Sequence, residues 1–120
     1  MENHKLVLPE DLNHYGYLFG GALLKWVDEY AWIAVSLDYT KSNFVTIGFD
    51  NVEFKKSVRG GTILKFIIEK EKEGNTSVKY KINVFNDNSE NGEKELVFST
   101  GVTFVCIDEQ GKKKALPKKK

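Results

Sequence analysis

Asp28 and Glu29 are adjacent carboxylates inside an apolar stretch, residues 19–37, that contains no proline. On a helix, neighbouring side chains point about 100° apart, so the two carboxylates cannot share one solvent-facing stripe. A carboxylate beside apolar surface is costly unless it is paired or hydrogen-bonded, and one held in a cleft is a candidate functional residue. Pairing with Lys25 or with a second subunit would explain the same pattern, so the helix alone leaves a structural and a catalytic role open.

A glycine-containing segment, residues 13–21 with the sequence NHYGYLFGG, precedes these acids. Glycines let the backbone turn sharply and approach a ligand, and the free N–H groups at a helix N-terminus offer a site for an anion. The spacing matches neither the dinucleotide-binding pattern nor the P-loop pattern. Glycine-containing turns also commonly precede helices that have no ligand, so this segment alone is weak evidence of a site.

Other catalytic motifs have little support. The chain has no G-x-S-x-G sequence, so a serine nucleophile of the α/β-hydrolase kind is not expected. It has two histidines, His4 and His14, and one cysteine, Cys106, so no metal site is expected. His14 is interpreted as a surface loop residue that could touch substrate, and Cys106 as a small core residue.

A single α+β domain, spanning residues 1–111, is predicted to position these groups. Helical spacing of apolar residues predicts one long helix over residues 20–37. Runs rich in Val, Ile, Phe, Tyr and Thr predict five strands, at residues 4–8, 44–54, 62–71, 76–85 and 96–107. Short turns between strands favour antiparallel pairing, so the helix must cover one face of a five-stranded sheet.

The predicted helix is apolar on more than one side. Trp26, Tyr30 and Trp32 extend the stripe that Val27 and Ala31 begin. One sheet can cover only one side of a helix. We therefore expect a second copy of the chain to bury the other apolar side.

The charges limit the partners. The chain carries 18 basic and 17 acidic residues, but residues 112–120 (KKKALPKKK) hold six lysines and no acid. The remaining residues are therefore net acidic, which argues against a nucleic-acid-binding surface on the fold itself. The basic tail is expected to be flexible, although it could also bind nucleic acid, a membrane or an anionic ligand.

The apolar stretch at residues 19–37 is interrupted by charges, so no membrane span is expected. The first residues, MENHKLVLPED, lack the apolar region and the cleavage site of a signal peptide. We therefore expect a cytoplasmic protein.

Three segments resemble the hotdog-fold acyl-CoA thioesterases of the bacterial and cytosolic acyl-CoA hydrolase type. Residues 12–34 include NHYGYLFGGALLKWVDEYAWIA, residues 44–60 read FVTIGFDNVEFKKSVRG, and residues 102–117 read VTFVCIDEQGKKKALP. The resemblance implies a hotdog fold, in which a curved antiparallel sheet wraps one helix. It also implies dimers whose sheets join edge to edge, which in relatives often assemble into trimers of dimers, with active sites at the dimer interface.

The resemblance also implies residue roles. Asp28 matches the catalytic carboxylate, and Asn13 matches the catalytic asparagine, contributed by the neighbouring subunit. Gly20 and Gly21 match a glycine pair whose amides could face the thioester carbonyl. The implied reaction is hydrolysis of acyl-CoA to a free acid and CoA, with Asp28 as general base; direct attack by the carboxylate is the less favoured variant.

Further substrate contacts are expected around these residues. Phe19 and His14 belong to the same segment as Asn13 and the glycine pair, residues 13–21, and are therefore expected to lie beside the substrate. Lys55, Lys56 and Arg59 form a compact basic group that could meet the phosphates of CoA, although they could equally be a solvated strand end. CoA is part of the substrate and the product, and no other cofactor is expected.

The alternative function is a non-catalytic acyl-CoA-binding or regulatory module of the same fold. Such a module would need no carboxylate at the reacting carbon, so the presence of both Asn13 and Asp28 favours an enzyme. A hotdog dehydratase usually carries a catalytic histidine on the helix, which this helix lacks. Tyr30 and Trp32 are bulky where relatives often have Ala or Gly, and are expected to narrow or redirect the acyl tunnel.

Overall fold

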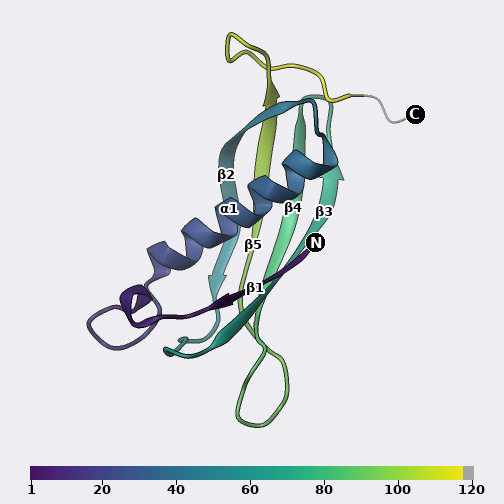
Figure 1. Ribbon diagram of the computed structural model, residues 1–120. Helices are drawn as coiled ribbons and strands as arrows, with labels where there is room; N and C mark the ends of the chain where they lie inside the picture. Colours follow the sequence, from purple (N-terminus) through teal and green to yellow (C-terminus); the bar gives the residue numbers. More distant parts are fainter. Residues whose placement is uncertain (118–120) are drawn as a thin grey trace.

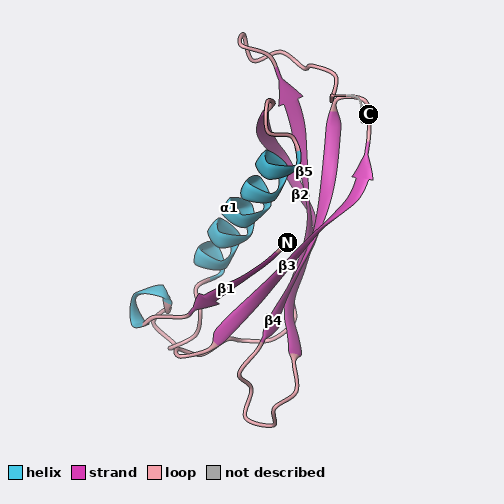
Figure 2. Ribbon diagram, turned by 45° about the vertical axis from the view of Figure 1, so that its right-hand side comes forward, coloured by secondary structure: helices cyan, strands magenta, loops and turns pink. Residues whose placement is uncertain are grey.

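The computed structural model describes residues 1–117 as a curved five-stranded antiparallel sheet with one α-helix on its concave face (Figures 1 and 2). The helix is α1 (Gly20–Asp38), and a short 3-10 helix precedes it at Pro9–Asp11. The strands are β1 (Glu2–Leu6), β2 (Asn43–Phe54), β3 (Ile63–Glu73), β4 (Ser77–Asn86) and β5 (Glu95–Ile107). The order across the sheet is β1-β3-β4-β5-β2. The predicted fold class is therefore confirmed.

The first strand lies at a sheet edge, as predicted, but it begins and ends two residues earlier. In the described part of the chain this strand pairs only with β3. The pairing stops because the Leu8 amide donates to Asp11 Oδ2 at 2.9 Å instead of to the sheet, and Pro9 then opens the 3-10 helix. The proline and the aspartate thus end the strand before residue 8.

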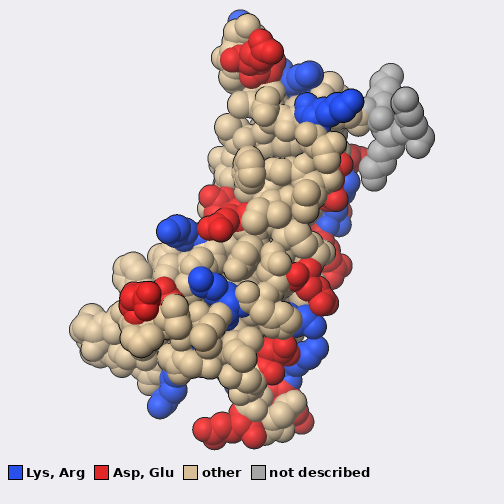
Figure 3. Space-filling view, in the orientation of Figure 1, with Lys and Arg blue, Asp and Glu red and all other residues tan. Residues whose placement is uncertain are grey.

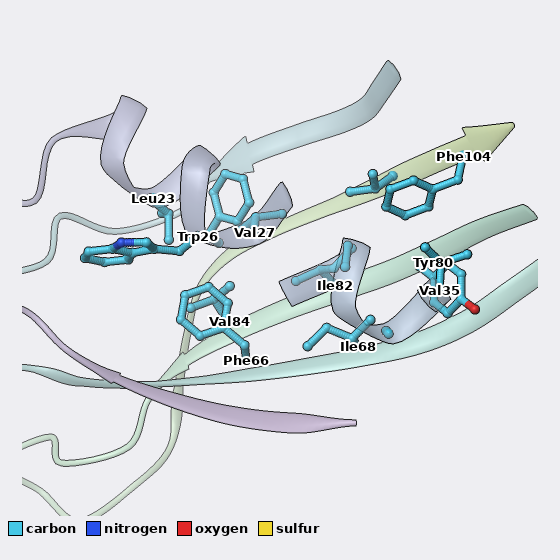
Figure 4. Packing of buried hydrophobic residues seen from close by; sticks show 14 of the residues in the cluster. Leu23, Trp26, Val27, Val35, Phe66, Ile68, Tyr80, Ile82, Val84 and Phe104 are labelled. Carbon is cyan, nitrogen blue, oxygen red and sulfur yellow. The ribbon is translucent and has the colours of Figure 1, made fainter. Parts of the chain in front are cut away.

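The core lies between α1 and the concave face of the sheet (Figure 4). The helix buries one face, formed by Leu23, Trp26, Val27, Ala31, Ala34 and Val35. Alternate residues of β3 and β4 bury the opposite wall, formed by Leu64, Phe66, Ile68, Val78, Tyr80, Ile82 and Val84. Burial of each large apolar side chain contributes about 1.5–3 kcal/mol. Burial with a period of two thus turns one face of this strand pair into the core.

β2 forms the other edge of the sheet, and within residues 1–117 it pairs only with β5. Five of its apolar side chains are exposed: Val45, Ile47, Phe49, Val52 and Phe54. The ladder is interrupted twice, between Thr46 and Gly48 and between Asp50 and Glu53. A long, apolar and unpaired edge is a template for another strand.

Part of the lysine-rich segment folds back onto the domain. The Lys114 amide donates to the Cys106 carbonyl at 2.9 Å, and the Leu116 amide donates to the Asn75 carbonyl at 2.8 Å. Leu116 packs against the core. Lysines 118–120 lie outside the described residues, so the flexibility of the tail stays a prediction.

Within residues 1–117, no helix combines the length and the apolar character that crossing a membrane requires.

Candidate active site

Asp28 lies near the middle of α1 and is partly exposed, and a residue of the sheet holds its carboxylate in place. The Thr46 hydroxyl donates a hydrogen bond of 2.8 Å to Asp28 Oδ1. Thr46 belongs to β2 and pairs with Phe104, a core residue of β5, so it lies on the concave face that α1 covers. One carboxylate oxygen is thereby fixed, and the other is available to a water or ligand.

Thr46 is the functional candidate that sequence reasoning missed. A signal existed, because the strand alternates Phe44 and Thr46 on one face with Val45 and Ile47 on the other. A hydroxyl on the inward face of a strand beside a helix must find a hydrogen-bond partner. Asp28 is that partner.

Asn13 organises the turn before α1. Its Oδ1 accepts hydrogen bonds from the amides of Tyr15 at 2.9 Å and Tyr17 at 3.1 Å. The turn closes through Gly16, whose φ of 84° favours glycine. Because two donors hold the side-chain oxygen, the amide nitrogen points away from the turn, and no acceptor within residues 1–117 pairs with it.

A cavity of about 310 Å³ opens beside Asn13. Gly20 lies on its helix side, and Lys55 and Lys56 lie at the end of β2 that borders it. The structure therefore brings together the predicted catalytic asparagine, one predicted oxyanion glycine and two of the predicted CoA-binding lysines. What binds in the cavity is untested, so their roles stay predictions.

The two lysines are also ion-paired at the surface. Lys55 Nζ lies 2.7 Å from Glu53 Oε2, and Lys56 Nζ lies 3.1 Å from Glu95 Oε2. The hydrogen bond from Lys55 holds the pKa of Glu53 below its ordinary value. Exposed pairs of this kind are weak, so either lysine can turn to a phosphate at little cost.

The first amides of α1 are free. The Phe19 carbonyl accepts hydrogen bonds from Ala22 at 3.0 Å and Leu23 at 3.2 Å, but in the described part of the chain the amides of Gly20 and Gly21 have no acceptor. A Cβ added to Gly21 would lie 2.9 Å from the Phe19 ring, so the glycine lets this ring lie against the helix start. The Phe19 side chain itself is 58% exposed.

The remaining predicted contacts are scattered. The ring of His14 lies 4.0 Å from that of Tyr15, on the exposed loop. The Arg59 guanidinium lies 5.7 Å from the centre of the Tyr17 ring, and Arg59 lines a second cavity, of about 580 Å³, against residues 86–91. The three residues of the predicted basic group therefore border two different cavities.

No hydrogen bond or shared cavity joins Asn13 to Asp28 within residues 1–117. Asp28 lies eight positions beyond Gly20, which is about 12 Å along the helix axis. The described chain thus holds two separate parts of the predicted site: the asparagine turn with its cavity, and the carboxylate with its threonine.

A polar cluster fixes the far end of α1. The Tyr80 hydroxyl donates to Asp38 Oδ2 at 2.6 Å, and the Tyr39 hydroxyl donates to Glu73. Burial, and then the hydrogen bond to Asp38, raise the pKa of Tyr80 well above its usual range. This cluster ties the helix to the sheet away from Asp28.

Charged side chains of both signs are scattered over a largely uncharged face that carries α1 (Figure 3). Among residues 1–117, no three His, Cys, Asp or Glu side chains are grouped as metal ligands would be.

One helix wrapped by a five-stranded antiparallel sheet, with a carboxylate on the helix and a glycine-containing turn before it, defines the class of hotdog-fold thioesterase-like proteins. A family model described as Thioesterase superfamily matches residues 15–93. The chain belongs to this superfamily, and the family expected from the sequence is confirmed.

Several known proteins are similar over most of the chain. An uncharacterized acyl-CoA thioester hydrolase of Bacillus subtilis is 29% identical over 114 residues, which cover 93% of this chain and 64% of the relative. The chain thus spans 64% of the length of that curated relative.

Solved structures agree with this relationship. The acyl-CoA hydrolase of Staphylococcus aureus, solved with butyryl coenzyme A and coenzyme A, is 30% identical with a TM-score of 0.89, over 98% of this chain and 71% of that one. Solved variants of the S. aureus enzyme replace an aspartate, a threonine and an asparagine with alanine. A hexameric acyl-CoA thioesterase is 35% identical with a TM-score of 0.88, over 98% of this chain and 74% of that one.

Proposed function

We propose that this chain hydrolyses acyl-CoA thioesters to a free carboxylic acid and CoA, with Asp28 as the general base. The observation that carries the proposal is the Asp28 carboxylate, which Thr46 holds through one oxygen while no hydrogen bond within residues 1–117 occupies the other. Similarity to acyl-CoA hydrolases over nearly the whole chain supports the substrate class.

The reaction proceeds by addition of water. Asp28 accepts a proton from a water molecule as the water oxygen attacks the thioester carbon. The hydrogen bond from Thr46 fixes the orientation of the carboxylate. The C–S bond then breaks, the proton passes to the departing sulfur, and the acid is released.

Asn13 and the first amides of α1 stabilise the charge that develops on the carbonyl oxygen. The Asn13 amide nitrogen is a fixed donor because its oxygen is held by the Tyr15 and Tyr17 amides. The free N–H group of Gly20, which lines the same cavity, is a further donor, and that of Gly21 follows it on the helix. A preorganised donor of this kind contributes about 3 kcal/mol in other hydrolases.

The complete site forms between two copies of the chain. The exposed apolar edge of β2 is the surface on which a second copy pairs, and pairing would bury Val45, Ile47 and Phe49. The asparagine turn and cavity of one subunit then face Asp28 and Thr46 of its partner. Hexameric relatives support further assembly as a trimer of dimers.

The S. aureus variants support this choice of residues. In that enzyme the replaced asparagine and aspartate are fifteen positions apart, which is the spacing of Asn13 and Asp28. Its replaced threonine follows the aspartate by seventeen positions, and Thr46 follows Asp28 by eighteen.

Lys55 and Lys56 contact the phosphates of CoA, because both line the cavity beside Asn13. Arg59 contacts a more distant phosphate, since it borders the second cavity. Such contacts predict that affinity for CoA falls as salt rises.

The test is release of free thiol from a series of straight-chain acyl-CoAs by the wild-type chain, Asp28→Asn, Asp28→Ala and the control Glu29→Gln. We expect turnover by the wild type and by Glu29→Gln, and its loss in both Asp28 variants with unchanged thermal unfolding. Binding of acyl-CoA without thiol release by the wild type would identify the non-catalytic module instead.

A further inference from the structure

Trp32 exposes a large apolar surface one helical turn from the proposed base. Its side chain is 50% exposed, although indole is among the most apolar groups in the chain. Residues four positions apart share one face of a helix, so Trp32 follows Asp28 at a spacing of about 6 Å along the axis. Helical side chains lean toward the N-terminus, so the indole extends over the turn that carries Asp28.

The surroundings of Asp28 are apolar on the sheet side too. Phe49 is the next β2 residue after Thr46 that pairs with a core position, Val102, and it is 39% exposed. The Asp28–Thr46 pair therefore has an exposed indole four residues further along the helix and an exposed phenyl ring three residues further along the strand.

The two ends of an acyl-CoA differ in what they can bind. Phosphates match the lysines of the cavity beside Asn13, whereas a hydrocarbon group matches exposed indole. We propose that Trp32 is a specificity-determining residue that packs against the acyl group and restricts the substrates to short chains. This inference rests on the proposed function, since it needs a thioester carbon at Asp28.

The physical basis is the space beside the reacting carbon. An acyl chain that extends past Asp28 on this side must cross the position that the indole occupies, about one helical turn away. A short acyl group packs against the indole ring, which favours its binding. A longer acyl group clashes with the ring, which disfavours its binding. Replacing Trp32 with alanine removes both effects.

The experiment compares kcat/KM for acetyl-, butyryl-, octanoyl- and palmitoyl-CoA in the wild type, Trp32→Ala and Trp32→Phe. Leu37→Ala is the matched control, because Leu37 is a more exposed apolar residue of α1, at 65%, but points about 140° away from Trp32. Inhibition by free CoA and the size of the assembly are measured for every variant.

We expect Trp32→Ala to raise the ratio of palmitoyl-CoA to butyryl-CoA activity by about tenfold or more, with Trp32→Phe intermediate and Leu37→Ala unchanged. Inhibition by free CoA should stay constant. An unchanged ratio, a shift only in CoA inhibition, or dissociation of the assembly in Trp32→Ala would overturn the inference. Absence of thiol release by the wild type would instead defeat the proposed function.

Discussion

The Thr46 hydroxyl on β2 lies 2.8 Å from Asp28 Oδ1 on α1, so the proposed base is oriented by the strand at the edge of the sheet. Because β2 is also the exposed edge on which a second copy is proposed to pair, assembly and orientation of the base share one element.

Replacing Thr46 with valine should lower kcat about 10- to 100-fold, because a hydrogen bond to a charged group contributes about 1.5–3 kcal/mol. KM should change little, since Thr46 acts through Asp28. Thr46→Ser keeps the hydroxyl and should retain most of the activity. Thiol-release kinetics of the two variants decide the point, and equal loss in both would show that the hydrogen bond is not the cause.

Mixing two inactive variants tests whether the site is shared between subunits. Asn13→Ala and Asp28→Asn, unfolded and refolded together in equal amounts, should recover about a quarter of wild-type activity, because a mixed dimer holds one site with both native residues. If both residues acted within one chain, the mixture would stay inactive. Size-exclusion chromatography establishes that mixed assemblies form.

Gly16→Ala should destabilise the fold by about 1–2 kcal/mol, because Gly16 has a φ of 84° that residues with a Cβ adopt only with strain. It should also reduce activity, since the same turn fixes Asn13. Gly92→Ala is the matched control, with a φ of 75° in the loop before β5. Chemical unfolding and thiol release, measured together, should show a similar loss of stability in both variants and a loss of activity only in Gly16→Ala.

Stability should fall in alkaline solution as the tyrosines at the far end of α1 ionise. Burial and the contact with Asp38 raise the pKa of Tyr80 above its ordinary value of 10.0, so its contribution is complete below pH 10.0 and is lost as pH rises above that value. Tyr80→Phe should make the unfolding free energy fall less steeply above pH 10.0. An unchanged slope in denaturation at several alkaline pH values would contradict this assignment.

The elements were predictable because their signals are local. Helical spacing from Gly20 onward and the period of two in β3 and β4 depend on neighbouring residues, and both match the structure. The resemblance of the residues around Asp28 to a known signature supplied the family, which composition and periodicity alone did not.

What the sequence did not reveal depends on contacts through space. The irregularity after Thr46 shifts the alternation of β2 by one residue, so Phe49 pairs with the core residue Val102 although strict alternation from Phe44 would turn it outward. The separation of Arg59 from Lys55 likewise follows from the path of the loop after β2, which residue spacing does not encode.

The separation of Asn13 from Asp28 in the described chain has a consequence for how the protein would behave on dilution. If each catalytic centre arises only where two molecules meet, then turnover per molecule is itself a function of concentration. At concentrations too low for association, folded wild-type protein would have no activity. Adding an inactive Asp28 variant that retains Asn13 would restore part of that activity, because the variant supplies the missing asparagine.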